Sequence, residues 1–292
     1  MTTTQQHLSH QQIVEYYEEA GMDYRAWSKN FNMHFGYYKW GQNPFNLESM
    51  LVQMNEEVYQ RMGIERVHLP TILDAGCGLG TTSRYIARKR SDALLYGVTI
   101  TPWQIKEGEK KNEAAGLQDQ VIMLKADYQA LPVADESFDG AFALESSCYA
   151  KGLDKRPFLA EMYRVLRSGS QLVITDGFMK KSKPFPKIIN WLYRKCTKNW
   201  ALTDFANLEM FLAAMKSVGF SKIKVEDASW KIALSVLHIP RITFQFYFDL
   251  LKKGESWQLS KERRGNVVAP ILGMLLGIAR PYFGYYIITA QK

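Results

Sequence analysis

Short apolar runs alternate along the middle of the chain with longer stretches in which apolar residues recur every three or four positions. The first pattern is typical of buried β-strands and the second of amphipathic helices. Seven runs are predicted as strands, at residues 72–73, 94–98, 121–125, 140–144, 171–175, 223–226 and 285–290. Strands that alternate with helices predict an α/β fold, in which a mostly parallel sheet is covered by helices on both faces.

The chain before the first strand departs from this alternation. Helical patterns begin at Ile13 and again at Phe45, and residues 16–38 are unusually rich in Tyr, Trp and Phe. Aromatic side chains that carry a polar group either pack on a domain or cover and line a ligand pocket. Their density here favours the second alternative, a lid that covers the pocket. Residues 1–10 are expected to form a disordered tail.

These patterns divide the chain into four parts. Residues 1–62 form the helical and aromatic lid, and residues 63–177 form the core with its first five strands. Residues 178–282 contain a basic, aromatic cap segment, the sixth strand and a helical insertion. Residues 283–292 return to the core as its final strand.

Composition supports a folded chain and excludes several classes of protein. Hydrophobic residues make up 47% and aromatic residues 13% of the 292 residues, which is enough for a sizeable core. The three cysteines are scattered, so we expect reduced thiols and no zinc site. The polar start does not resemble a signal peptide, and the longest apolar run, Val267–Ala279, is too short to span a bilayer. We expect a cytoplasmic protein, with peripheral membrane contact left open.

The net charge of +8 is moderate, and its distribution is more informative than its sum. Seven basic residues and no acidic residue lie between Lys180 and Lys198, interleaved with aromatic and aliphatic side chains. Three interpretations stay open: a solvated basic face, a contact with a membrane surface, or a pocket for an anionic substrate. No nucleic-acid-binding module is recognised, so a nucleic-acid partner is not expected.

The most informative stretch is Thr71–Ser83, which reads T-I-L-D-A-G-C-G-L-G-T-T-S. A strand breaks into three alternating glycines and then into a helix, and such glycines let a ligand approach the backbone closely. The spacing differs from the dinucleotide fingerprint G-x-G-x-x-G, and no Lys-Ser/Thr follows to form a phosphate-binding P-loop. Asp74 precedes the first glycine, where it is placed to hold the loop or a cationic amine.

The sequence D-A-G-C-G-L-G resembles motif I of class I S-adenosylmethionine-dependent methyltransferases. The resemblance implies that S-adenosylmethionine is the cofactor, S-adenosylhomocysteine the product, and that the sheet is Rossmann-like with an antiparallel last strand. The implied cofactor-binding residues are Asp74, Gly76, Gly78, Gly80, Thr99, Thr101, Gln104, Asp127 and Tyr128. T-I-T-P-W-Q resembles a pattern of tocopherol methyltransferases and cyclopropane fatty acid synthases, in which hydroxyl and amide groups replace the usual ribose-binding carboxylate.

Four of the singled-out residues share one structural position, because each follows the end of a predicted strand. They are Gly76, Thr99, Asp127 and Glu145. Ligands in open parallel sheets bind beyond the carboxyl ends of the strands, so one ligand site is expected to contain all four.

The stretch Ala143–Ala150, A-L-E-S-S-C-Y-A, lies where the methyl acceptor is expected. It resembles sterol, tocopherol and geranyl diphosphate C-methyltransferases, with which it shares Glu145, and Tyr149 corresponds to the prenyl diphosphate enzymes. Glu145 is a candidate general base, although a structural glutamate that holds the loop is the alternative. The further catalytic candidates are Tyr149, Tyr17 and His34, and a packed histidine is the alternative for His34.

These features predict a methyltransferase that acts on a lipophilic small molecule, most simply at a carbon of an isoprenoid. The alternatives are a quinol- or tocopherol-type ring methyltransferase and an O- or N-methyltransferase of a specialised metabolite. No metal is expected, except Mg²⁺ if the substrate is a diphosphate held by the basic segment. The sequence leaves the substrate, the methylated atom and the oligomeric state open.

Overall fold

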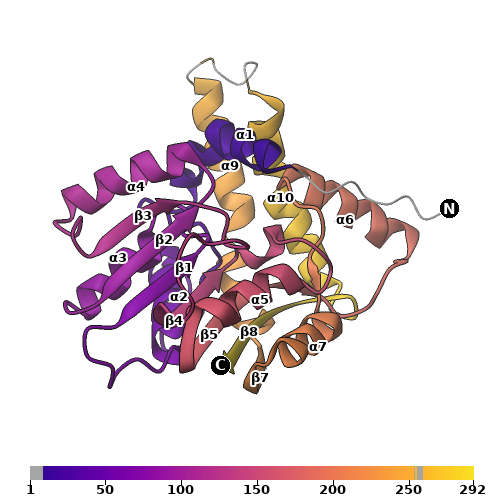
Figure 1. Cartoon of the computed structure of the whole chain (residues 1–292). Coiled ribbons are helices and arrows are strands. Elements are labelled where there is room, and N and C mark those ends of the chain that lie inside the picture. The colour runs from indigo at the N-terminus through magenta and orange to yellow at the C-terminus, as the bar shows by residue number, and fades with distance from the viewer. Residues whose placement is uncertain (1–8, 253, 255–258) are drawn as a thin grey trace.

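The computed structural model describes residues 9–252, 254 and 259–292 (Figure 1). Residues 1–8 of the predicted tail lie outside the described residues. The tail prediction is wrong for residues 9 and 10, because Ser9 caps α1 (His10–Ala20) in a capping box with Gln12. In this motif the serine side chain and the residue three positions later satisfy each other's backbone N–H groups, which fixes the helix start.

One sheet forms the centre of the molecule, with the strand order β3-β2-β1-β4-β5-β8-β7 and a short strand β6 paired with β5. β8 runs antiparallel to β5 and β7, and the other pairings are parallel. The predicted fold class is therefore confirmed. The strands are β1 (Thr71–Ala75), β2 (Leu94–Thr99), β3 (Val121–Lys125), β4 (Phe138–Leu144), β5 (Leu166–Met179), β6 (Ala206–Asn207), β7 (Ser221–Asp227) and β8 (Phe283–Gln291).

The burial of the strands explains why they could be recognised in the sequence as apolar runs. The last four residues of β1 are buried, whereas β7, the edge strand, contains no fully buried residue. Parallel strands that are covered on both faces appear as continuous apolar runs. The two-residue β6 carries no such run and was not predicted, so the predicted sixth strand corresponds to β7.

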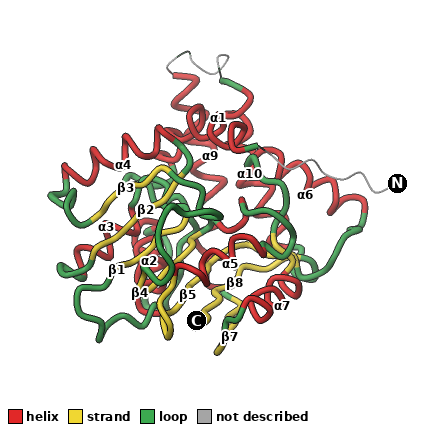
Figure 2. The backbone as a smooth tube through the Cα atoms, in the orientation of Figure 1, coloured by secondary structure: helices red, strands yellow, loops and turns green. Residues whose placement is uncertain are grey.

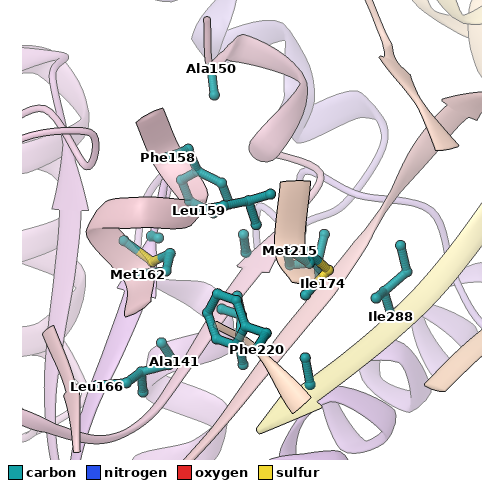
Figure 3. Packing of buried hydrophobic residues seen from close by; sticks show 14 of the residues in the cluster. Ala141, Ala150, Phe158, Leu159, Met162, Leu166, Ile174, Met215, Phe220 and Ile288 are labelled. Carbon is teal, nitrogen blue, oxygen red and sulfur yellow. The ribbon is translucent and has the colours of Figure 1, made fainter. Parts of the chain in front are cut away.

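Helices cover both faces of the sheet, and consecutive strand residues alternate between two cores. Leu73 packs on one side with α5 and α7, and its neighbour Ile72 packs on the other with α2, α3 and α8. Figure 3 shows the first core, in which Phe158 and Met162 of α5 approach Met215 of α7. The core helices are α2 (Leu47–Arg61), α3 (Thr81–Lys89), α4 (Pro102–Ala114), α5 (Arg156–Val165), α7 (Leu208–Val218) and α8 (Ser229–Val236).

A second group of helices gathers on the side of the sheet where the strands end (Figures 1 and 2). It consists of α1, η1 (Gly21–Ala26), α6 (Lys187–Asn199), α9 (Ile239–Lys252) and α10 (Lys261–Ile278). α6 packs along α10 through a separate apolar cluster that includes Tyr193 and Leu272. Among the described residues, no helix is both long and apolar enough to cross a membrane.

Candidate active site

A narrow cavity of about 100 Å³ opens where β1, β2, β3 and β4 end, and we call it the cofactor-side cavity. Gly80 does not line it, because this glycine is the N-cap of α3 with a φ of +73°. The other eight residues predicted to bind the cofactor do line it: Asp74, Gly76, Gly78, Thr99, Thr101, Gln104, Asp127 and Tyr128.

The glycine turn is fixed by its neighbours as well as by its backbone angles. Gly76 has a φ of +90°, and a Cβ at this position would lie 2.3 Å from Cβ of Ser146. Ser146 follows β4 and donates a hydrogen bond to the carbonyl of Ala75, so the two strand ends are joined directly. Because a side chain at Gly76 would collide with this contact, only glycine permits β1 and β4 to end side by side.

Asp74 holds the loop from inside. Its Oδ2 accepts a 2.6 Å hydrogen bond from the Ser83 hydroxyl on α3, so it ties the end of β1 to the first turn of the helix. Burial raises the pKa of Asp74 to about 7, against the opposing effects of the Ser83 hydrogen bond and the Arg84 charge. A cationic group bound in the cavity would favour the ionised form.

The end of β2 carries a buried network without a carboxylate. The Thr99 hydroxyl donates to Oε1 of Gln104 at 2.5 Å and accepts from the backbone N–H of Thr101 at 3.2 Å. The network orients the Gln104 amide as a donor at the cavity wall, and its NH₂ group has no hydrogen-bond partner among the described residues. This is a physical basis for replacing the acidic residue that nucleotide-binding folds commonly place here.

α1 reaches the cofactor-side cavity, which the sequence pattern did not indicate. His10, the first residue of α1, places Nε2 3.2 Å from Oδ2 of Asp127, and Ile13 also lines the cavity. Asp127 in turn accepts a 2.8 Å hydrogen bond from the backbone N–H of Gln129. The signal that would have located His10 is the Ser9–Gln12 capping box, which places the helix start at His10, three residues before Ile13.

A second and larger cavity, of about 650 Å³, lies beside the first, and we call it the acceptor-side cavity. Its walls come from distant parts of the chain, namely the aromatic segment after α1, the ends of β4 and β5, α8, α9, α10 and the start of β8. Most of its lining is apolar. The larger side chains include Tyr24, Trp27, Phe35, Phe178, Trp200, Phe205, Trp230, Ile242, Phe246, Met274 and Phe283.

Five residues line both cavities: Tyr17, Met33, His34, Glu145 and Tyr149. Four of these five were predicted to be catalytic from the sequence. Met33, the fifth, contacts the glycine turn, because a Cβ on Gly78 would lie 3.3 Å from its sulfur. We call these five residues the junction.

Glu145 is the acidic residue of the junction. It directly follows β4 with a φ of +51°, and its Oε1 accepts hydrogen bonds from the Phe35 N–H at 2.7 Å and the Tyr285 hydroxyl at 2.8 Å. Its Oε2 accepts no hydrogen bond from any described residue. Burial raises the pKa of Glu145 to about 8, an effect that the two hydrogen bonds oppose and the nearby Asp176 reinforces. A carboxyl group with this pKa is mostly protonated at neutral pH in the empty site, and a cation bound nearby would favour the carboxylate form that can accept a proton.

The two junction tyrosines form a directed hydrogen-bond chain. The Tyr149 hydroxyl donates to the carbonyl of Trp200 at 3.1 Å, and it lies 2.9 Å from the Tyr17 hydroxyl. Because Tyr149 has one proton, Tyr17 must be the donor between them. Burial raises the pKa of both tyrosines well above 10, so both stay neutral. The rings and oxygen lone pairs of the two tyrosines would stabilise a positive charge that develops on a bound molecule.

His34 is held in one tautomer. Its Nδ1 lies 2.9 Å from the carbonyl of Phe35, which can only accept, so Nδ1 carries the proton. Nε2 is buried and has no hydrogen-bond partner among the described residues. Burial lowers the pKa of His34 to about 4, so the imidazole is neutral and Nε2 keeps its lone pair.

Two buried charged residues that the sequence analysis missed hold the loop that follows Glu145. Oδ2 of Asp176 accepts from the Ser147 hydroxyl at 2.6 Å and the Cys148 N–H at 2.9 Å. Nζ of Lys155 donates to the carbonyls of Cys148, Ala150 and Asp204 at 2.8–2.9 Å. Asp176 follows the predicted fifth strand and could have been found by the rule that located Glu145, but no sequence signal marks Lys155.

The basic segment lies away from both cavities. None of its seven basic side chains between residues 180 and 198 lines either one. Lys183 pairs with Asp204, and Lys180 lies 3.4 Å from Asp227. Among the described residues, no group of three or more His, Cys, Asp or Glu side chains is arranged to hold a metal ion.

The chain's sequence relatives are methyltransferases. The methyltransferase-domain family matches residues 73–174. An O-methyltransferase of Aspergillus nomiae is 34% identical over 54% of this chain and 68% of its own length. A probable chloroplastic tocopherol O-methyltransferase of Oryza sativa is 27% identical over 95% of this chain and 76% of its own length. Methyltransferase GfsG of Streptomyces halstedii is 33% identical over 56% of this chain, which spans only 57% of that protein.

Solved structures confirm the fold over nearly the whole chain. Geranyl diphosphate C-methyltransferase of Streptomyces coelicolor, in complex with Mg²⁺, geranyl diphosphate and S-adenosylhomocysteine, has a TM-score of 0.69 at 15% identity, covering 99% of this chain and 98% of that one. The [4+2]-cyclase SpnF has a TM-score of 0.71 at 21% identity, with 93% and 94% covered. Together with the sequence relatives and the residues around the glycine turn, these findings show that the chain belongs to the class I S-adenosylmethionine-dependent methyltransferases.

Proposed function

We propose that this protein methylates a neutral, lipophilic small molecule, and that the methylated atom is a carbon of an isoprenoid alkene. The observation that carries the proposal is the junction. A cavity lined by the residues predicted to bind the cofactor meets a large apolar cavity at Tyr17, Met33, His34, Glu145 and Tyr149. A methyl donor on one side and an acceptor on the other would meet at these side chains.

The cofactor-side residues fit the group that the family uses. Asp74 and Asp127 are acceptors for amino groups, the Gln104 amide is a donor, and Gly76 and Gly78 leave the backbone accessible. When bound, S-adenosylmethionine would supply an electrophilic methyl group on a positively charged sulfur. The protein's part is alignment and exclusion of water, and Met33 and Tyr17 cover the cavity from the N-terminal segment.

The acceptor-side cavity favours a neutral molecule over a diphosphate. Its lining contains three carboxylates, Asp23, Glu145 and Asp176. Arg280 is its one basic Lys or Arg side chain within the described residues, and this guanidinium is already paired with Asp227 at 2.9 Å. A diphosphate would need several free cationic groups or a metal ion. The substrate named for the Streptomyces coelicolor structure is therefore not the one that this cavity best fits.

Carbon methylation gives three of the junction residues a role. The acceptor's π electrons form the new bond to the methyl carbon as the carbon–sulfur bond breaks, which leaves a carbocation on the acceptor. The rings of Tyr17 and Tyr149 and the carboxylate of Glu145 would stabilise this cation. Glu145, with one unpaired oxygen, would then accept the proton from the neighbouring carbon, so that a double bond re-forms.

A second candidate is O-methylation, and one observation favours it. His34 is neutral, and its Nε2 has no partner among the described residues, so it could accept the proton of an acceptor hydroxyl. The relatives from Aspergillus nomiae and Oryza sativa carry the name O-methyltransferase. A tocopherol- or quinol-type ring acceptor would fit the same apolar cavity.

The direct test is methyl transfer from labelled S-adenosylmethionine to a parallel panel of sterols, terpenoid alkenes, quinols, tocopherol-type phenols and prenyl diphosphates. Label on a carbon of a neutral isoprenoid supports the proposal, and label on a hydroxyl oxygen supports the second candidate. Efficient transfer to a diphosphate but not to the corresponding neutral alcohol would contradict the argument from the cavity.

A further inference from the structure

We propose that the outward face of α8 and α9 docks on a lipid bilayer that contains anionic headgroups, and that the acceptor-side cavity opens toward this bilayer. The docking rests on the surface described below. Loading of the cavity from the bilayer additionally rests on the proposed function, because it assumes a lipophilic acceptor.

α9 is apolar on two sides. Ile242, Thr243 and Phe246 line the acceptor-side cavity, while Phe244, Phe248 and Leu251 point away from it and are exposed. The exposed residues recur at spacings of four and three, so they share one face of the helix. The rings of Phe244 and Phe248 are stacked with centroids 6.2 Å apart, although Phe244 is 71% exposed. A water-facing helix normally carries polar residues at these positions.

The exposed rim of the cavity includes residues of α8 and of the turn between α8 and α9. Trp230, Leu237 and Ile278 line the cavity and yet are 76%, 65% and 72% exposed. They therefore form an apolar rim between the interior and the surface. A molecule that moved from a bilayer past this rim would pass from one apolar environment to another, without crossing water.

The loop after residue 38 extends the apolar surface. Its ends are attached to α8 and the start of α9, because Tyr38 N–H donates to the carbonyl of Lys231 at 2.7 Å and His238 Nε2 lies 2.9 Å from the carbonyl of Pro44. These contacts bring the exposed side chain of Phe45 next to the turn between α8 and α9. Exposed aromatic residues that gather around a cavity mouth are unusual for a surface that meets only water.

The charged residues of α8 and α9 indicate that an anionic lipid surface binds here. Residues 229–252 contain three basic side chains, Lys231, Arg241 and Lys252, against one acidic residue, Asp249. Arg241 and Lys252 form no ion pair within the described residues, and Lys252 Nζ lies 4.4 Å from the ring centre of Phe248. Basic side chains interleaved with exposed aromatic residues favour a negatively charged lipid interface.

α6 is the competing membrane contact. It exposes Ile188 and Trp191 among the basic residues of segment 180–198, where the sequence left membrane contact open. None of its exposed residues lines the acceptor-side cavity. The surface on α8 and α9 is preferred because it alone combines exposed apolar residues, basic residues and the cavity mouth within the described part of the chain.

The test is co-sedimentation of the full-length protein with phosphatidylcholine vesicles, with and without phosphatidylserine and without cofactor or acceptor. The triple variant Phe244→Gln/Phe248→Gln/Leu251→Gln should bind the anionic vesicles at least about tenfold more weakly than the wild type. Leu69→Gln is the matched control, because Leu69 is about as exposed as Leu251 but precedes β1, at the end of the strands opposite the cavities, and it should bind as the wild type does. The pair Arg241→Gln/Lys252→Gln should lose binding mainly to anionic vesicles at low salt.

Three results would overturn the docking: unchanged binding of the triple variant, loss of binding only in Ile188→Gln/Trp191→Gln on α6, or a wild-type dimer that the triple variant converts to a monomer. Unfolding curves of each variant identify any loss caused by misfolding. Because binding is measured without substrate, a protein that binds vesicles but methylates no isoprenoid would leave the docking intact and remove the proposed function. For the loading step, the triple variant should match the wild-type rate on a detergent-solubilised acceptor and be slower on the same acceptor in vesicles.

Discussion

The two cavities differ in how they are built, although they share five residues. The cofactor-side cavity takes most of its lining from residues that directly follow β1, β2, β3 and β4. The acceptor-side cavity takes its lining from segments as far apart as residues 17 and 285. Short segments at the strand ends form most of the first cavity, and the N-terminal segment covers it. The second exists only after the N-terminal segment and the C-terminal helices have packed together. We expect the first to be sensitive to backbone changes and the second to tolerate changes that alter specificity.

Gly76→Ala should have the largest effect, because it acts on the part of the site that depends on backbone geometry. The new Cβ would lie 2.3 Å from Cβ of Ser146 at a φ of +90°, so the turn must move. We expect cofactor affinity, measured by calorimetry, to fall by roughly 100-fold or more, the scale of a strained backbone combined with a buried collision.

Gly116→Ala is the matched control for that measurement. Gly116 also has a positive φ, of +66°, but a Cβ there would have no atom within 4 Å. Its cost should be confined to backbone strain, about 1 kcal/mol of unfolding free energy, with cofactor affinity unchanged. Equal losses of affinity in the two variants would contradict the importance of the contact with Ser146.

Glu145→Gln tests the junction, where the two cavities meet. The amide keeps the shape of the side chain but cannot accept a proton, so turnover should drop by a factor on the order of 10²–10⁴. In carbon methylation the methyl group is transferred before the proton is lost. The carbocation would then be trapped by water or would lose a different proton, giving methylated alcohols or displaced double bonds.

Product analysis by mass spectrometry and NMR separates the mechanisms. Slower turnover with an unchanged product would favour O-methylation, while wild-type rate and product would leave Glu145 with only its structural contacts to Phe35 and Tyr285. Tyr285→Phe is the companion variant, because it removes one donor to Glu145 and keeps the carboxylate. The Tyr285→Phe enzyme should lose less activity than the Glu145→Gln enzyme and should give the wild-type product.

The same contrast explains how much the sequence could predict. The fold class and the cofactor-side residues were predictable because a glycine turn and a strand end are formed by neighbouring residues. Glu145 was predictable by the same rule. Its partner Tyr285 was not, since 140 residues separate them and no local pattern joins them.

The boundaries of the acceptor side were also beyond prediction. The lining role of α8, α9 and α10 depends on how helices pack over the strand ends, and periodicity gives a helix but not its neighbours. Lys155 illustrates the limit, because a lysine is rarely buried and only the three carbonyl groups around it explain its position. The lid, cofactor-binding, catalytic and domain assignments made from the sequence remain predictions.

Thr243→Trp should separate the two cavities in function. Thr243 lines only the acceptor-side cavity, and an indole there would occupy space that the acceptor needs. We expect acceptor binding to weaken by about 1–3 kcal/mol, seen as a KM raised roughly 5- to 150-fold. Cofactor affinity should stay within about twofold of the wild type, which is within the usual scatter of surface effects.

Gln245→Trp, on the exposed side of the same helix, is the control and should change neither constant. A loss of cofactor affinity in Thr243→Trp would mean that the cavities are coupled beyond the junction.

The smallest expected effect is a pH dependence of stability, to which each cavity contributes one buried acid. Burial raises the pKa of Asp74 from 3.8 to about 7 and that of Glu145 from 4.5 to about 8. The folded protein therefore keeps protons that the unfolded chain releases, and the stability contributed by each carboxyl is present at low pH and lost as pH rises to its folded pKa.

Urea unfolding of the cofactor-free protein should show a midpoint that falls between pH 5 and pH 8.5. Glu145→Gln should remove the fall between about pH 7 and pH 8 and lessen the slope below it, whereas Asp74→Asn should lessen the slope only up to about pH 7. If both variants keep the full wild-type pH dependence, the two acids are already ionised in the folded protein, and the base assigned to Glu145 would have to work with an ordinary carboxylate.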